Sequence, residues 1–109
     1  MSGAAYPVML DAARLRILVV GGGQVATRKV AGLTDAGGRP DIVAPAVTEA
    51  LRAAVDGLRL AWHPRPYRSD DVEGRHLVFA ATDDAGVNAR IADDARAAGA
   101  LVSRAYEGG

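Results

Sequence analysis

Apolar residues occur along this chain in short runs, and amphipathic stretches separate one run from the next. The runs within Arg16–Val20 and His76–Ala81 do not alternate with polar residues, which is typical of strands buried on both faces of a parallel sheet. Shorter runs predict strands at Asp41–Ala44 and Ala100–Arg104. In Leu58–His63 apolar and polar positions alternate, which predicts an edge strand with one wetter face.

Three amphipathic stretches between the runs predict helices. The first spans about Gln24–Ala36, where apolar residues recur at helical spacing before a pair of glycines. The second begins near Val47 and ends at Gly57. The third follows three residues that commonly cap helices, namely Thr82, Asp83 and Asp84.

The order of these elements predicts the fold class. Right-handed crossovers and the doubly wound rule favour one Rossmann-like α/β domain over residues 1–109, with a parallel sheet in the order 3-2-1-4-5. The strand order reverses between the first and fourth strands, and ligands bind at the carboxyl ends of the strands at such a point. We therefore expect a nucleotide site where four segments meet: Gly21–Val25, Ala44–Ala46, Ala80–Asp84 and Arg104–Glu107.

A glycine-rich turn joins the first predicted strand to the first predicted helix. Its spacing, Gly21-x-Gly23-x-x-Ala26, fits the G-x-G-x-x-G/A fingerprint of dinucleotide-binding loops. Glycine lets the backbone approach a ligand closely, and the free N–H groups and dipole at the start of the helix attract phosphate. The turn predicts a dinucleotide site, and a purely structural turn is the alternative interpretation.

Composition narrows the class of protein further. The chain of 109 residues has thirteen basic and thirteen acidic residues and no cysteine, so no bulk charge attracts nucleic acid and no disulfide forms. It contains no apolar run near eighteen residues and no signal-peptide pattern at its start. No His/Cys/Glu cluster has metal-ligand spacing. We expect a cytoplasmic protein that binds no nucleic acid, no membrane and no preformed metal.

Three motifs give the chain a family likeness. GGGQVATRK follows the first predicted strand, VAP follows the second, and AATDDAGVNARI leads from the fourth strand into the third helix. Together they resemble precorrin-2 dehydrogenase, the N-terminal domain of siroheme synthase, from about Tyr6 to the end of the chain. The resemblance implies an NAD-dependent oxidoreductase that converts precorrin-2 to sirohydrochlorin in siroheme biosynthesis. Some members of the family also insert ferrous iron.

The resemblance also implies site residues. Carried over by position, Gln24, Val25, Pro45 and Ala46 would contact NAD. The family's catalytic aspartate serves as general acid/base and takes part in chelation, and the matching position here is Glu107. A glutamate moves the carboxylate by about one bond length, and displacements near 1 Å can cost about 10²-fold in rate.

The family continues past this point into a helical dimerisation segment that completes the tetrapyrrole pocket, and this chain ends before it. We therefore expect the chain to form a homo-oligomer or to bind a partner that completes its C-terminal side. A non-catalytic NAD-binding module is the alternative function. A ligand-gating NAD domain of the kind that regulates potassium transport is a second one, although the chain lacks the acidic residue expected after the second strand.

Further polar residues are candidates for the same site. Thr82 and Asp83 are first of all helix caps, and their place at the rim predicts a second role near the nicotinamide ribose. Arg28 and Lys29 either form a solvated helix face or contact the pyrophosphate or the carboxylates of an acidic tetrapyrrole. Arg104 is a further candidate for binding substrate.

Ribose recognition departs from the usual Rossmann pattern. An acidic residue about 20 positions after the glycines should hold the ribose hydroxyls, but Val43, Ala44 and Pro45 occupy that zone. Ribose contact is therefore expected from the backbone at Pro45 and Ala46. We favour NAD over NADP because no arginine follows the second strand to meet a 2′-phosphate, and Arg28 keeps the alternative open.

Overall fold

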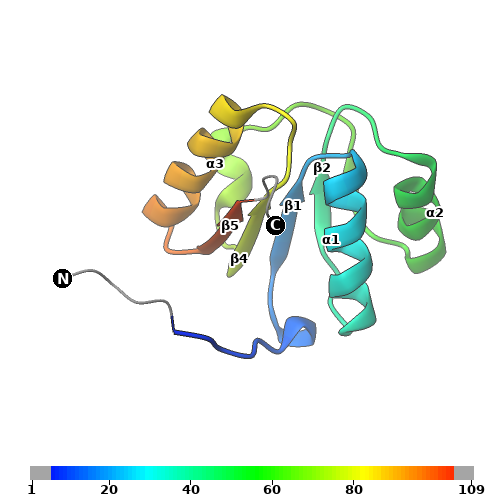
Figure 1. Cartoon of the computed structure of the whole chain (residues 1–109), viewed down its shortest axis with the longest axis horizontal. Helices are drawn as coiled ribbons and strands as arrows, with labels where there is room; N and C mark the ends of the chain where they lie inside the picture. Colours follow the sequence, from blue (N-terminus) through cyan, green and yellow to red (C-terminus); the bar gives the residue numbers. More distant parts are fainter. Residues whose placement is uncertain (1–5, 105–109) are drawn as a thin grey trace.

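The computed structural model describes residues 6–104 of the chain. Its centre is a five-stranded sheet in the order β3-β2-β1-β4-β5, and every neighbouring pair is parallel (Figure 1). The strands are β1 (Ile17–Val20), β2 (Asp41–Val43), β3 (Trp62–His63), β4 (Leu77–Ala80) and β5 (Leu101–Arg104). The predicted Rossmann-like fold and strand order are confirmed. Four of the five strands lie within one residue of their predicted bounds.

Three α-helices cover the sheet, α1 (Gln24–Asp35), α2 (Glu49–Leu58) and α3 (Ala85–Ala97), and two short 3-10 turns, η1 (Ala12–Arg14) and η2 (Ser69–Val72), complete the described elements. α1 and α2 lie on one face, and α3 lies on the other with η2 (Figure 1). Among residues 6–104, no helix is both long and apolar enough to cross a lipid bilayer.

The apolar run of β1 is buried on both faces of the sheet. Leu18 and Val20 belong to the core under α3, and Val19 belongs to the core under α1 and α2. Each of these side chains is at most 2% exposed, and burying one stabilises the fold by about 1.5–3 kcal/mol. This two-sided burial explains why the run lacks polar residues and why β1 is central.

The region after α2 differs from the prediction. The helix does not end at Gly57 but continues to Leu58, and the strand predicted at 58–63 is reduced to the two residues of β3. Arg59 ends the helix in a left-handed conformation with φ of 56°, which glycine usually supplies. Arg39 Nη2 donates to the carbonyl oxygens of Leu58 at 2.8 Å and Arg59 at 3.0 Å. Helical spacing within 47–57 could not reveal this distant contact.

A connector between β3 and β4 runs along the α3 face of the sheet, where Tyr67 and Val72 enter the core. An ion pair between Arg65 Nη2 and Asp71 Oδ1, 2.6 Å apart, holds its turn together. Burial by itself raises the pKa of Asp71, but the hydrogen bonds from Arg65 and from the backbone of Arg68 outweigh it and lower that pKa. The connector is therefore a fixed wall beside the carboxyl ends of the strands.

Candidate functional site

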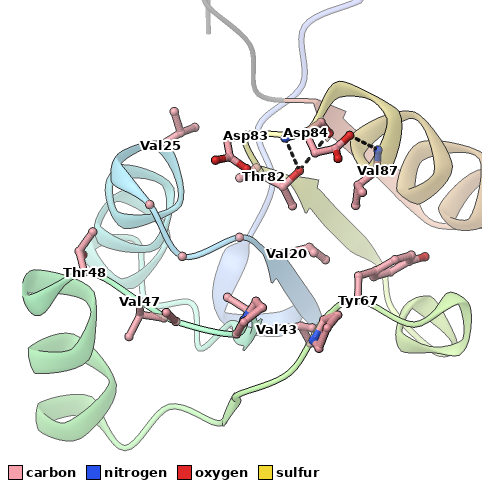
Figure 2. A pocket seen from close by; sticks show the side chains of 18 of the residues that line it. Val20, Val25, Val43, Val47, Thr48, Tyr67, Thr82, Asp83, Asp84 and Val87 are labelled. Carbon is pink, nitrogen blue, oxygen red and sulfur yellow. Dashed lines mark hydrogen bonds between the residues drawn. The ribbon is translucent and has the colours of Figure 1, made fainter.

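A cleft of about 760 Å³ lies at the carboxyl ends of the strands. Segments that follow β1, β2 and β4 form it, together with the connector after β3 and the start of α3 (Figure 2). These are three of the four rim segments expected from the sequence. Of the fourth segment, Arg104 does not line the cleft, and 105–107 lie outside the described residues.

The first two glycines of the turn bring three loops into close contact. Gly21 has φ of +133°, and a Cβ there would lie 2.2 Å from the carbonyl oxygen of Ala81. A Cβ on Gly22 would lie 1.9 Å from the carbonyl oxygen of Ala46. The Gly22 carbonyl also accepts a hydrogen bond from the amide of Thr48 at 2.9 Å. These two glycines therefore have a structural role, and that of Gly22 was not predicted from the sequence.

The third glycine leaves the start of α1 open. Gly23 is the N-cap of α1, and no side chain there caps the helix. A Cβ on Gly23 would meet no atom within 4 Å. The first N–H groups of an α-helix have no partner within the helix, and Gln24 and Val25 of this first turn line the cleft. The turn can therefore bind an anionic group such as a pyrophosphate through backbone donors and the helix dipole.

The start of α3, by contrast, is closed by its own side chains. Asp84 is the N-cap, and its Oδ1 accepts from the amide of Val87 at 3.1 Å (Figure 2). The side chain of Thr82 accepts from the Asp84 amide at 3.2 Å. The predicted capping role of this segment is confirmed for Asp84. Asp83 lines the cleft and is exposed.

A buried asparagine holds the loop before α3. Asn88 is 6% exposed. Its Oδ1 accepts from the Thr82 hydroxyl at 2.6 Å and from the Thr82 amide at 3.1 Å, and its Nδ2 donates to the Thr82 carbonyl at 3.0 Å. Asn88 belongs to the motif AATDDAGVNARI, but no role was predicted for it, although a polar residue three positions before the buried Ile91 of the same helix was an available signal.

Tyr67 and Arg90 form the wall of the cleft on the α3 side. The Tyr67 hydroxyl donates to Asp94 Oδ2 at 2.7 Å, and the Arg90 guanidinium stacks over the Tyr67 ring. Burial and the hydrogen bond to Asp94 raise the pKa of Tyr67 well above its ordinary value, so the hydroxyl remains a donor near neutral pH. No local pattern in the sequence could reveal this pair, because its members lie on separate elements.

The site residues predicted from the sequence fall into three groups. Eight of them line the cleft: Gly21, Gly23, Gln24, Val25, Pro45, Ala46, Thr82 and Asp83. Arg28, Lys29 and Arg104 do not line it. Glu107 lies outside the described residues. Within residues 6–104, no three His, Cys, Asp or Glu side chains lie close enough together to hold a metal ion.

Asp41 lies at the first position of β2, away from the cleft. Its Oδ2 pairs with Arg75 Nη1 at 2.5 Å. His76, which precedes β4, accepts a hydrogen bond at Nδ1 from the Arg16 amide at 2.8 Å. Both side chains therefore make structural contacts outside the cleft.

Comparison with protein families gives an independent indication of what the cleft binds. A family model described as "Putative NAD(P)-binding" matches residues 8–107. This range contains the five strands and three α-helices described above, together with the loops of Ala46 and Ala81 that pack against the glycine turn. The match agrees with an anion site at the open start of α1.

Comparison with individual proteins confirms the resemblance drawn from the three motifs. A siroheme synthase of Ectopseudomonas mendocina is 47% identical over 80% of this chain and 18% of its own length. Another, from Pseudoalteromonas atlantica, is 37% identical over 90% of this chain and 21% of its own. The solved structure of SirC, a precorrin-2 dehydrogenase, superposes with a TM-score of 0.77 and 29% identity, over 91% of this chain and 48% of that one. The chain thus spans about a fifth of the curated relatives' length.

Proposed function

Because this chain belongs to the NAD(P)-binding family whose model matches residues 8–107, we propose that it binds NAD in the cleft and acts in the oxidation of precorrin-2 to sirohydrochlorin. The relatives are siroheme synthases and a precorrin-2 dehydrogenase, which supports this reaction class. The chain spans only part of each of them, so their activity is proposed here for this chain.

The open start of α1 is the observation that carries the proposal. It combines an uncapped first turn with a glycine that lines the cleft and has no atom within 4 Å of the position of a Cβ. A pyrophosphate needs such a surface, because backbone N–H groups must come within hydrogen-bond distance of its oxygens. The residue types therefore fit a dinucleotide, with the pyrophosphate against Gly23, Gln24 and Val25.

We place the adenosine half on the side of the cleft that follows β2. Pro45 and Ala46 line the cleft there and are exposed, so their backbone would contact the ribose. No carboxylate of a residue between 43 and 48 is available for the ribose hydroxyls. No arginine lies there to meet a 2′-phosphate either, which favours NAD over NADP.

When bound, NAD supplies the hydride acceptor, and the chain's residues supply placement and proton handling. Thr82 and Asp83, on the loop that Asn88 fixes, would lie beside the nicotinamide ribose. We assign proton transfer to the carboxylate of Glu107, on its sequence position in the family motif alone.

The direct test is anaerobic NADH formation from precorrin-2 by the full chain. We expect NADH from the unaltered chain, almost none from Glu107→Ala, and an equal or faster rate in Glu107→Asp, which restores the family's residue. NAD binding without NADH formation would overturn the enzymatic proposal in favour of a non-catalytic NAD-binding module. An unchanged rate in Glu107→Ala would remove Glu107 from the mechanism.

We also propose that the chain associates with itself or with a partner along β5. This strand is at the edge of the sheet, and its Leu101 is 58% exposed. An exposed edge strand with apolar side chains favours pairing with another chain. Light scattering at micromolar concentrations should show a mass above that of the monomer for the isolated chain. A monomer throughout that range, with no partner captured, would contradict the proposal.

A further inference from the structure

A single cation lies on the wall of the cleft. Among the described residues that line it, Arg90 is the only arginine or lysine. It projects from α3, one turn after Val87, which lines the same wall. Backbone donors at the start of α1 lie on the side of the glycine turn. The cleft thus has two separate places where an anion could be held.

The guanidinium of Arg90, an exposed residue, makes two contacts with Tyr67. Its Cζ lies 5.0 Å from the centroid of the Tyr67 ring, and its Nη2 donates to the Tyr67 carbonyl at 3.3 Å. Stacking on an aromatic face attracts the cation without neutralising it. An arginine held in this way keeps its remaining N–H donors for another acceptor.

The acidic residue that would ordinarily neutralise Arg90 is used elsewhere. Asp94 follows Arg90 by one helical turn, the spacing at which opposite charges pair, but Asp94 Oδ2 accepts from the Tyr67 hydroxyl instead. In the described part of the chain Arg90 has no carboxylate oxygen within 4.0 Å. The salt bridges of the described residues involve five arginines, Arg14, Arg52, Arg65, Arg75 and Arg96, and the remaining arginines, Arg90 among them, make none. Arg90 therefore presents an unneutralised charge at the cleft.

The position of the wall decides which anion this charge would meet. In Figure 2 Tyr67 and Val87 lie on one side of the glycine turn, and Val47 and Thr48 lie on the other. The adenosine half of the dinucleotide, with any 2′-phosphate, is proposed to bind beside Val47 and Thr48, in the segment that follows β2. The wall formed by Tyr67 and Arg90 is on the opposite side, with the start of α3 and the proposed nicotinamide position. The substrate, an acidic tetrapyrrole with several carboxylates, has to approach the nicotinamide there to give up a hydride.

We propose that Arg90 is a substrate-binding residue that pairs with a carboxylate of the tetrapyrrole, and that Tyr67 positions it by stacking and by occupying Asp94. This rests on the proposed function. A pairing between guanidinium and carboxylate is a charge-assisted hydrogen bond, and planar donors can make it bidentate. The residue selects acidic side chains on the substrate and takes no part in holding the dinucleotide.

The test measures the affinity of the full chain for NAD and, separately, its affinity for a porphyrin. Uroporphyrin, a stable tetrapyrrole polycarboxylate, is titrated by fluorescence quenching and NAD by calorimetry. We expect Arg90→Ala to weaken uroporphyrin binding about tenfold or more and to leave NAD affinity within about twofold. Arg96→Ala, an exposed arginine on the same helix, is the matched control and should change neither. Circular dichroism checks that each variant is folded.

The positioning role of Tyr67 has its own readout. In Tyr67→Phe the hydroxyl is lost, so Asp94 becomes free to pair with Arg90 and uroporphyrin binding should weaken. Adding Asp94→Asn removes the competing charge and should restore the affinity. A structural defect caused by losing the hydroxyl would not be rescued in this way, so failure of the rescue would overturn the role of Tyr67.

Three outcomes would overturn the role of Arg90. They are equal losses in Arg90→Ala and Arg96→Ala, a loss of NAD affinity with unchanged uroporphyrin binding, and no uroporphyrin binding by the unaltered chain. Failure of the proposed function would be seen separately. In that case the unaltered chain would bind no NAD or form no NADH, whatever the porphyrin titration showed.

Discussion

α1 and α3 occupy equivalent places beside the cleft but differ in how their first turns are capped. Each follows a central strand of the sheet, and each has its first turn at the cleft. α1 starts at a glycine with no side-chain cap. α3 starts at Asp84, whose carboxylate already accepts from the helix, on a loop that Asn88 holds by three hydrogen bonds.

The difference shows how one sheet edge provides both a donor surface and a fixed wall. The donors of α3 are satisfied by its own cap, so this end adds stability but offers little to an anion. The donors of α1 lack that cap, which leaves them for a ligand at a small cost to the helix. α2 starts like α3, because Thr48 Oγ1 accepts from the Leu51 amide at 3.1 Å. Of the three helices, α1 alone starts without a side-chain cap.

The largest effect is expected where the glycine turn passes closest to its neighbours. Gly21→Ala would place a Cβ 2.2 Å from a backbone oxygen in a residue with φ of +133°. Strain and overpacking together should lower the free energy of unfolding in urea by about 3 kcal/mol or more. Gly32→Ala is the matched control on α1, since no atom lies within 4 Å of its added Cβ, and it should be neutral or stabilising. A stable Gly21→Ala variant would contradict the close packing.

A smaller loss of stability is expected when the loop before α3 loses the side chain of Asn88. Asn88→Ala leaves the amide and carbonyl of Thr82 without their side-chain partner, while the Thr82 hydroxyl can still donate to the Asp84 carbonyl. An unsatisfied buried group costs about 1–3 kcal/mol. Chemical denaturation should show that loss relative to Asp93→Ala, which removes an exposed side chain from the same helix. Equal stability of the two variants would mean that the loop before α3 does not depend on Asn88.

The smallest effect concerns the cap itself. Asp84→Ala removes the acceptor for the Val87 amide and should lower stability by about 1 kcal/mol. Asp84→Asn keeps an oxygen that can accept, so its thermal midpoint should stay close to that of the unaltered chain. If both substitutions had the same effect, the charge and not the cap would be what matters at this position.

Sequence could predict the sheet and the open turn because both depend on local patterns. The apolar run of β1 follows from burial on both faces. The glycines follow from the close backbone approach at Gly21 and Gly22 and from the open helix start at Gly23. The end of α2 could not be predicted, because the left-handed Arg59 depends on Arg39 from a distant segment.

The wall formed by Tyr67 and Arg90 could not be predicted from the sequence either. Tyr67 lies on the connector and Arg90 on α3, and only the folded chain brings them together. Asn88 is an intermediate case, because a polar residue on the buried stripe of a helix is visible in the sequence but its partner is not. Residues that act through contacts between elements are thus the ones that local periodicity misses.

The most direct test of the account converts the start of α1 into the kind of start that α3 has. Gly23→Ser adds a side chain into free space and supplies a good N-cap, so stability should stay equal or rise by a few tenths of a kcal/mol. The serine hydroxyl would accept from a backbone N–H that the pyrophosphate needs. Calorimetry should therefore show that NAD binds about tenfold more weakly, or weaker still. Unchanged NAD affinity in a folded Gly23→Ser chain would contradict the claim that the open start of α1 holds the cofactor.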